Sequence, residues 1–126
     1  MSFLPPKDLE YLRDKGIAFV EHEEGGQKAV ILKGRPLPGD RFDAPAADIL
    51  IILPSGYPDV PPDMFYLLPW VRLAQSNTYP RAADQPLTFS GQTWQRWSRH
   101  CSDWRPGADG IWTMLKRIDY ALLVAA

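Results

Sequence analysis

Hydrophobic and polar positions near the start of the chain follow a helical period. Pro6 to Lys15 places Leu9 and Leu12 on one edge, with proline at the start and Gly16 directly after the end. Proline fits the first helical turn and glycine commonly ends a helix, so this segment predicts a short amphipathic helix.

The next segments have the shorter period of β-strands. Ile17 to Glu23 and Gln27 to Lys33 flank the pair Gly25-Gly26, which predicts a hairpin. Ala47 to Leu53 is apolar on both faces, as in a central strand, and Met64 to Leu68 predicts a further short strand.

The hydrophobic pattern is irregular from residue 69 to residue 103 and becomes regular again near the C-terminal end. Pro69 to Asp103 has no sustained period and is expected to be a long loop of functional importance. A helix is expected after it, with Asp109 as its N-cap, because apolar residues recur at helical spacing at Ile111, Met114, Leu115, Ile118 and Leu122. Strands in a run with helices at both ends indicate a single α+β domain over residues 1–126.

Composition and charge narrow the class of protein. The chain has 126 residues, of which 45% are hydrophobic and 23% charged, as in ordinary globular proteins. A net charge of −1 gives no reason to expect nucleic-acid or membrane binding. The single cysteine, Cys101, forms no internal disulfide, and Met1 to Pro6 lacks the features of a signal peptide. We therefore expect a soluble, cytoplasmic protein.

Two motifs resemble the ubiquitin-conjugating enzymes. Ile51 to Phe65 reads IILPSGYPDVPPDMF, which is similar to the strand, Tyr-Pro turn and Pro-Pro flap of that family. RWD domains, which are non-catalytic, share this turn. Trp104 to Ile118 reads WRPGADGIWTMLKRI and is similar to the Trp-x-Pro turn and the helix that follows the family's active site. The resemblance implies the ubiquitin-conjugating-enzyme fold, with an N-terminal helix, a four-stranded antiparallel meander, a long active-site loop and one C-terminal helix.

The chain also departs from the family pattern. The His-Pro-Asn element upstream of the nucleophile is absent, and the two helices usual at the C-terminus are missing. These departures, with the block Gln95 to His100, resemble a divergent prokaryotic branch of the superfamily. The absent asparagine leaves oxyanion stabilisation to another donor, for which the candidates are a backbone amide or the side chains of Asn77, Gln92, Gln95 and His100.

Two residues are candidate nucleophiles. Cys101 has an intrinsically reactive thiol, whose pKa Arg99 and His100 would lower if they face it, but it lies only three positions before Trp104. Ser98 lies six positions before that tryptophan and needs a base, which His100 supplies if the segment is extended. The alternatives without a catalytic role are that Cys101 is a small semi-buried residue and that Ser98 is a turn residue.

Further residues are expected to bind substrate. Trp97 and Arg99, with Trp94, have the composition of a partly exposed binding hot spot, whereas Trp104 and Trp112 are expected in the core. The resemblance implies that Asp103 helps to orient or deprotonate an incoming lysine, as acidic residues near the family's active sites do. Tyr57 offers a ring and a hydroxyl at the flap. The histidines and the cysteine have no spacing that supports a metal site.

The resemblance implies a carrier and transferase function. Such a protein accepts the C-terminus of a ubiquitin-like protein from an activating enzyme as an ester and passes it to an amine of a protein target. The helix Pro6 to Lys15 would dock the activating enzyme, and no bound cofactor is implied, because ATP is used by the upstream enzyme. The alternative is a catalytically inactive binding module of the same fold.

Overall fold

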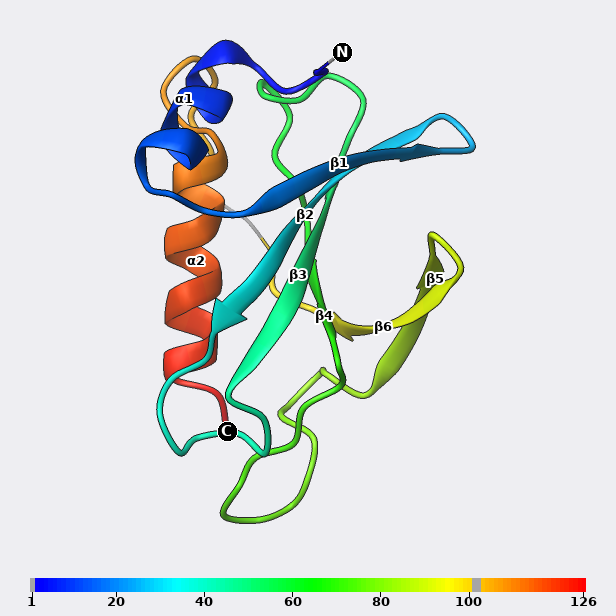
Figure 1. The fold of residues 1–126 in the computed structure, drawn as a ribbon, viewed down its shortest axis with the longest axis vertical. Coiled ribbons are helices and arrows are strands. Elements are labelled where there is room, and N and C mark those ends of the chain that lie inside the picture. Colours follow the sequence, from blue (N-terminus) through cyan, green and yellow to red (C-terminus); the bar gives the residue numbers. More distant parts are fainter. Residues whose placement is uncertain (1, 101–102) are drawn as a thin grey trace.

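A computed structural model describes residues 2–100 and 103–126 of the chain. Figure 1 shows two helices packed against one curled sheet. The elements follow the chain in the order α1 (Pro6–Asp14), β1 (Phe19–Glu24), β2 (Gln27–Pro36), β3 (Ala46–Leu53), β4 (Phe65–Leu68), β5 (Gln85–Phe89), β6 (Gln92–Trp97) and α2 (Ile111–Leu123). The predicted helices, the hairpin and the strands that became β3 and β4 are confirmed within a few residues at each end.

The sheet has six antiparallel strands in the order β1-β2-β3-β4-β6-β5, so the prediction of four strands was wrong. The two additional strands, β5 and β6, come from the segment that was expected to be a loop. Ser90 and Gly91, both with positive φ, form the two-residue turn between them. Their conformation matches the twist of a tight hairpin, and Ser-Gly is the local signal for it in the sequence.

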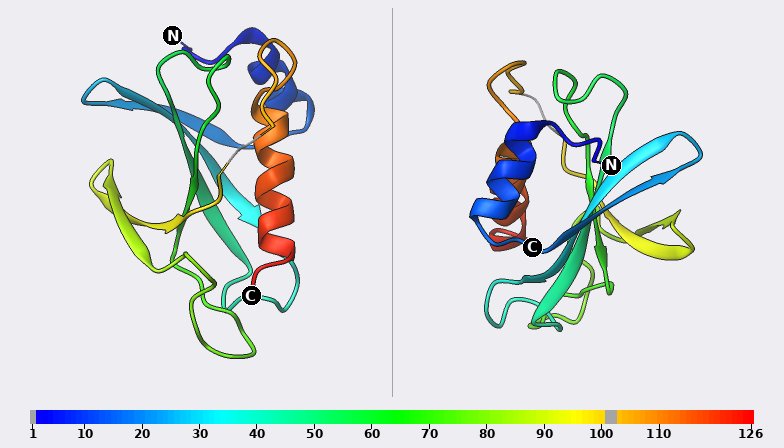
Figure 2. Two further views of the ribbon diagram at one scale, coloured as in Figure 1. Left: turned by 180° about the vertical axis from the view of Figure 1, so that it is seen from behind. Right: turned by 45° about the horizontal axis from the view of Figure 1, so that its top comes forward.

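One face of the sheet packs against both helices (Figures 1 and 2). The core on this side is built from β2, β3, β4 and the inner face of α2, where Ile111, Met114, Leu115, Ile118 and Leu122 are all buried as the helical spacing predicts. Tyr11 of α1 packs on Trp112 of α2 with ring centroids 6.1 Å apart. Burying each large aliphatic side chain contributes roughly 1.5–3 kcal/mol, so this face supplies much of the stability.

The opposite face has a second, smaller core, because the sheet curls until its two edge strands meet. The His22 ring of β1 lies 5.5 Å from the Phe89 ring of β5, and the Ser90 N–H donates to Glu24 Oε2 at 3.2 Å. Trp94 is enclosed beneath this closure. The β5–β6 hairpin therefore covers a face that would otherwise be exposed.

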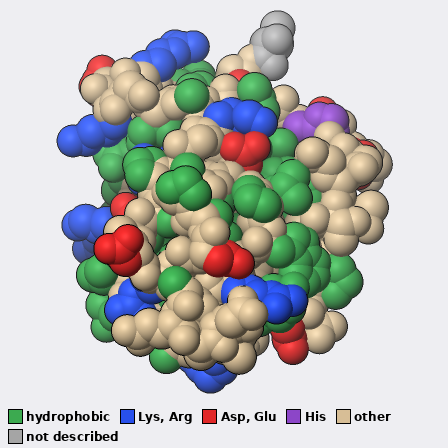
Figure 3. All heavy atoms as spheres, turned by 60° about the horizontal axis from the view of Figure 1, so that its bottom comes forward, with side chains coloured by type: hydrophobic (Ala, Val, Ile, Leu, Met, Phe, Trp, Pro, Cys, Tyr) green, Lys and Arg blue, Asp and Glu red, His purple; other side chains and the backbone are tan. Residues whose placement is uncertain are grey.

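No helix in residues 2–100 or 103–126 is long and apolar enough to cross a membrane. The face drawn in Figure 3 mixes acidic, basic and hydrophobic side chains and carries no broad patch of a single charge.

Candidate functional site

Ser98 lies directly after β6 and is half-buried. Its backbone N–H donates to Ala82 O at 3.0 Å, which fixes the end of the strand. Its hydroxyl donates to Met64 Sδ at 3.8 Å and not to His100. A thioether is a weak acceptor, so this contact orients the hydroxyl without activating it.

His100 is held by the flap. Its Nδ1 lies 3.0 Å from Asp63 Oδ1, and both side chains are well exposed, at 70% and 64%. A carboxylate on Nδ1 favours the tautomer that carries its proton there, which leaves Nε2 as the basic nitrogen. A base oriented by a carboxylate is the arrangement that activates a serine or cysteine nucleophile. Asp63 is a functional candidate that sequence reasoning missed, although it lies inside the flap motif.

Cys101, the other candidate nucleophile, lies outside the described residues. In the sequence it stands between His100 and Asp103, and both of these line one groove.

The groove runs between α2 and the chain that follows β6, with a volume of about 620 Å³. Phe65, Met114 and Ile118 form an apolar floor, and Arg81 and Arg99 line it as well. Thus His100, Arg99 and Asp103, three of the predicted site residues, meet at one surface, whereas Ser98 is absent from its lining.

The tryptophans are distributed in the opposite way to the sequence prediction. Trp94 and Trp97 are fully buried, at 1% and 0% exposed, while Trp104 and Trp112 are only half-buried. The expectation that Trp97 is a partly exposed binding residue was therefore wrong. Its role is internal: its ring stacks on Phe65 at 5.4 Å, and its indole N–H has no partner among the described residues.

Arg99 lies across the buried Trp97, its guanidinium 5.1 Å from the ring centroid, a cation–π contact. Its Nη1 donates to Ser98 O at 3.1 Å. Burial, and then the charge of Arg81 nearby, lower the pKa of Arg99 below its usual value. The positive charge of Arg99 at the groove wall is thus disfavoured both by burial and by a second cation nearby.

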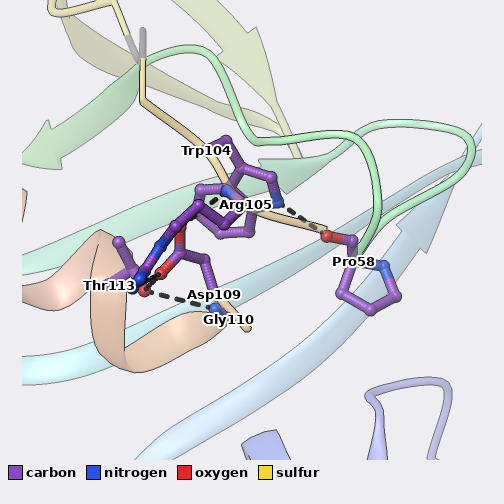
Figure 4. A network of polar contacts seen from close by, with 6 residues as sticks. All are labelled: Pro58, Trp104, Arg105, Asp109, Gly110 and Thr113. Atoms are coloured by element: carbon purple, nitrogen blue, oxygen red, sulfur yellow. Dashed lines mark hydrogen bonds and ion pairs between the residues drawn. The ribbon is translucent and has the colours of Figure 1, made fainter. Parts of the chain in front are cut away.

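The turn before α2 is fixed to the flap (Figure 4). Trp104 Nε1 donates to Pro58 O at 2.8 Å, and the Trp104 and Tyr57 rings are 6.4 Å apart. Asp103 directly precedes Trp104 in the chain, so the hydrogen bond of Trp104 also holds the backbone of Asp103 near the flap.

Asp109 closes the turn but does not cap the helix, so that prediction was wrong. Gly110 is the N-cap of α2. Asp109 accepts the Arg105 N–H at 2.8 Å and the Thr113 hydroxyl at 3.0 Å (Figure 4). The Arg105 backbone hydrogen bond is the main reason why the pKa of Asp109 lies below its usual value.

The missing cap comes from α1, 103 residues away in the chain. Asp8 is 1% exposed, and its Oδ1 accepts the Ile111 N–H at 3.3 Å at the start of α2. A carboxylate at a helix N-terminus is favoured by the helix dipole. The Tyr57 hydroxyl donates to Asp8 Oδ2 at 2.5 Å. Tyr57 thus joins the flap to both helices, and its predicted contact with substrate stays a prediction.

Comparison with known families agrees with this geometry. Residues 4–125 match a family described as Prokaryotic E2 family E. The chain belongs to that family. Neither a curated protein nor a solved structure matches the chain. The family assignment confirms the predicted divergent prokaryotic branch, and with it an E2-like α+β fold.

In this prokaryotic E2 family E protein, the side chains expected as oxyanion donors lie in different environments. Gln95 does not serve, because it is fully buried: its Oε1 accepts the Val71 N–H, and its Nε2 donates to Val71 O and Ala83 O. Of the side chains suggested by the sequence, His100 alone lines the groove; Asn77 and Gln92 are exposed elsewhere on the surface. No cluster of His, Cys, Asp and Glu suited to a metal ion occurs within the described residues.

Proposed function

We propose that this prokaryotic E2 family E protein is a conjugating carrier. It accepts the C-terminal carboxyl of a ubiquitin-like protein from an activating enzyme and transfers it to an amine on a protein target. The family supports a role in ubiquitin-like conjugation. The observation that supports the catalytic part is the His100–Asp63 pair, with His100 Nδ1 and Asp63 Oδ1 3.0 Å apart. In the chain, His100 stands between the two candidate nucleophiles, Ser98 and Cys101.

The chemistry balances without a cofactor. The nucleophile, Ser98 Oγ or Cys101 Sγ, attacks the tail carbonyl held as a thioester on the activating enzyme. A carbon–oxygen or carbon–sulfur bond forms, the bond to the activating enzyme's sulfur breaks, and the nucleophile's proton passes to His100 Nε2. A target amine then attacks this ester, a carbon–nitrogen bond forms, and the nucleophile recovers a proton as it leaves.

The exposure of α1 and of Asp103 supports the proposed docking roles. The outer face of α1 presents Lys7, Glu10 and Arg13 to solvent, whereas Asp8 and Leu12 face inward. This face is the proposed docking surface for the activating enzyme, since the helix is held rigidly by its buried side. Asp103, exposed at the groove, is proposed to orient the target amine.

A test is to mix the protein with its cognate activating enzyme, ubiquitin-like protein and ATP, and to analyse the products on a non-reducing gel. An adduct cleaved by thiol reductant and lost in Cys101→Ala identifies a thioester. An adduct that resists reductant, yields to alkali and is lost in Ser98→Ala identifies an oxygen ester. Ser76→Ala, a substitution in an exposed loop, is the matched control.

A second candidate function is a non-catalytic binding module. It is favoured by the Ser98 hydroxyl, which contacts Met64 and not His100, and by the internal role of Gln95. Absence of any adduct in the presence of the correct partners would leave this alternative standing.

A further inference from the structure

The groove beside α2 combines an apolar floor with a basic rim. Phe65, Met114, Ile118 and Ala121 line it and are buried. Arg81, Arg99, Lys116 and Arg117 also line it, against the single acidic residue Asp103 among the described residues. This local excess of positive charge contrasts with the net charge of −1 for the whole chain.

Three of these cations have no acidic partner among the residues that the structure describes. In the ion pairs formed by the described residues, Arg81, Arg99 and Lys116 do not take part, and Asp103 pairs with none of them. Arg117 already has an interaction partner. Burial, followed by repulsion from Arg81, lowers the pKa of Arg99, so the two guanidinium groups lie close enough to oppose each other. An anion between them would remove this repulsion.

The shape of the groove favours an extended peptide over a small anion. Its apolar floor continues along α2 to Tyr120 and Val124, which are 66% and 50% exposed. In an extended chain successive side chains point in opposite directions, so apolar side chains can face the floor while acidic ones face the rim. Guanidinium groups bind carboxylates with paired hydrogen bonds, which adds direction to charge attraction.

We infer that the groove binds an acidic stretch within the last residues of the ubiquitin-like protein's C-terminal tail. This inference rests on the proposed function, which brings that tail to the chain around His100. His100 and Asp103 stand at the same groove, and Arg99 directly follows Ser98. If the tail is esterified to Ser98 or Cys101, the last few residues of the tail therefore lie near the basic rim of the groove.

The charge selectivity is tested with synthetic probes. The first is a fluorescein-labelled hexapeptide of alternating leucine and aspartate, and the second carries lysine in place of aspartate. By fluorescence anisotropy at low salt, we expect the acidic peptide to bind at least about 10-fold more tightly, and added salt to reduce the difference. Equal affinity for the two peptides would overturn the inference.

Charge-altered variants localise the binding. Arg81→Glu and Arg99→Glu should each weaken the acidic peptide about 10-fold. Lys28→Glu, on an exposed position of β2, is the matched control and should leave affinity unchanged. Because Arg99 packs on Trp97, the neutral double variant Arg81→Gln/Arg99→Gln, with its circular dichroism spectrum, separates loss of charge from loss of fold.

The adduct assay separates this inference from the proposed function. If the wild type forms an adduct and the charge-reversed variants form it at the same rate, the groove inference is wrong and the proposed function stands. If no adduct forms with the correct partners, the proposed function is wrong, and the assignment of the groove to a carried tail is overturned even where the acidic peptide binds. A slower adduct in both charge-reversed variants, with Lys28→Glu unaffected, supports both.

Discussion

The contact between Tyr57 and Asp8 gives a sharp test of how the flap is held. Tyr57→Phe removes one hydroxyl and keeps the ring, which lies 6.4 Å from Trp104. Asp8, at 1% exposed, loses its 2.5 Å hydrogen bond and retains the 3.3 Å contact with the Ile111 N–H. The substitution therefore isolates a single polar contact between the flap and the two helices.

Its size can be worked from the chemistry of the pair. A hydrogen bond to a charged group contributes roughly 1.5–3 kcal/mol net, and leaving the buried acceptor unpaired places the loss in that range. We expect the free energy of unfolding to fall by about 2 kcal/mol. With an unfolding entropy of about 2.1 cal/mol/K per residue over 126 residues, this loss lowers Tm by roughly 8 °C.

The loss should also depend on pH. Burial raises the pKa of Asp8 above its ordinary value, and the hydrogen bonds from Tyr57 and Ile111 oppose that shift. Because the folded state then holds this proton more tightly than the unfolded state, the contribution of Asp8 to stability falls as pH rises from the unfolded pKa through the folded one. Removing the hydroxyl raises the folded pKa further. The deficit of Tyr57→Phe should therefore be larger at about pH 7 than at about pH 3, which lies below the ordinary pKa of an aspartate, so that the folded state holds the proton there.

Urea unfolding followed by tryptophan fluorescence at the two pH values measures both effects. Tyr120→Phe is the matched control, because Tyr120 is 66% exposed, and its stability should stay within about 0.5 kcal/mol of the wild type. A loss below that size for Tyr57→Phe, or one that is equal at both pH values, would refute the reasoning.

Three further predictions concern other contacts of the fold. Gly110→Ala should cost about 1–3 kcal/mol by chemical denaturation, since a Cβ there would lie 2.6 Å from the Trp112 ring; Gly39→Ala, with nothing within 4 Å, should cost little. Gln95→Leu should destabilise the protein by at least about 3 kcal/mol in the same assay, because three buried backbone groups lose their partner. Asp109→Asn should reduce stability at neutral pH, and the gap should close in a pH titration of Tm as pH falls from about 4 through the lowered pKa, where the wild-type carboxylate is protonated.

Local pattern was sufficient for the elements whose burial follows from their own period. The helix α2 buries its apolar positions at helical spacing. Strand β3 is apolar on both faces because Ile49 and Ile51 pack in one core and Leu50 packs in the other. The β5–β6 hairpin was missed for a physical reason. Gln95 interrupts the apolar pattern of β6, yet it is buried because it satisfies backbone groups of a neighbouring loop, Val71 and Ala83. A polar residue used inside the core looks like a loop residue in the sequence.

The errors at the candidate site have a similar origin. Aspartate is a common N-cap residue, which is why Asp109 was expected to cap α2, but Asp8 of the distant helix α1 contacts the first N–H of α2. Trp97 stands among polar neighbours, yet the sheet places it against Phe65 in the core. The pairing of His100 with Asp63 joins residues 37 positions apart. The sequence could identify the segment that lines the groove, whereas the partners of each side chain depend on contacts that no local pattern encodes.

The curl of the sheet decides which surfaces are left for partners. Where β1 and β5 meet, through His22 and Phe89 and through Glu24 and Ser90, the face opposite the helices becomes a second core. That face retains a hollow of about 450 Å³, but Trp94 and Phe89 are enclosed. The helical side carries α1 and the basic groove. The proposed activating-enzyme surface and the proposed tail groove are thus on the same side of the sheet, as transfer of a tail from one protein to the other requires.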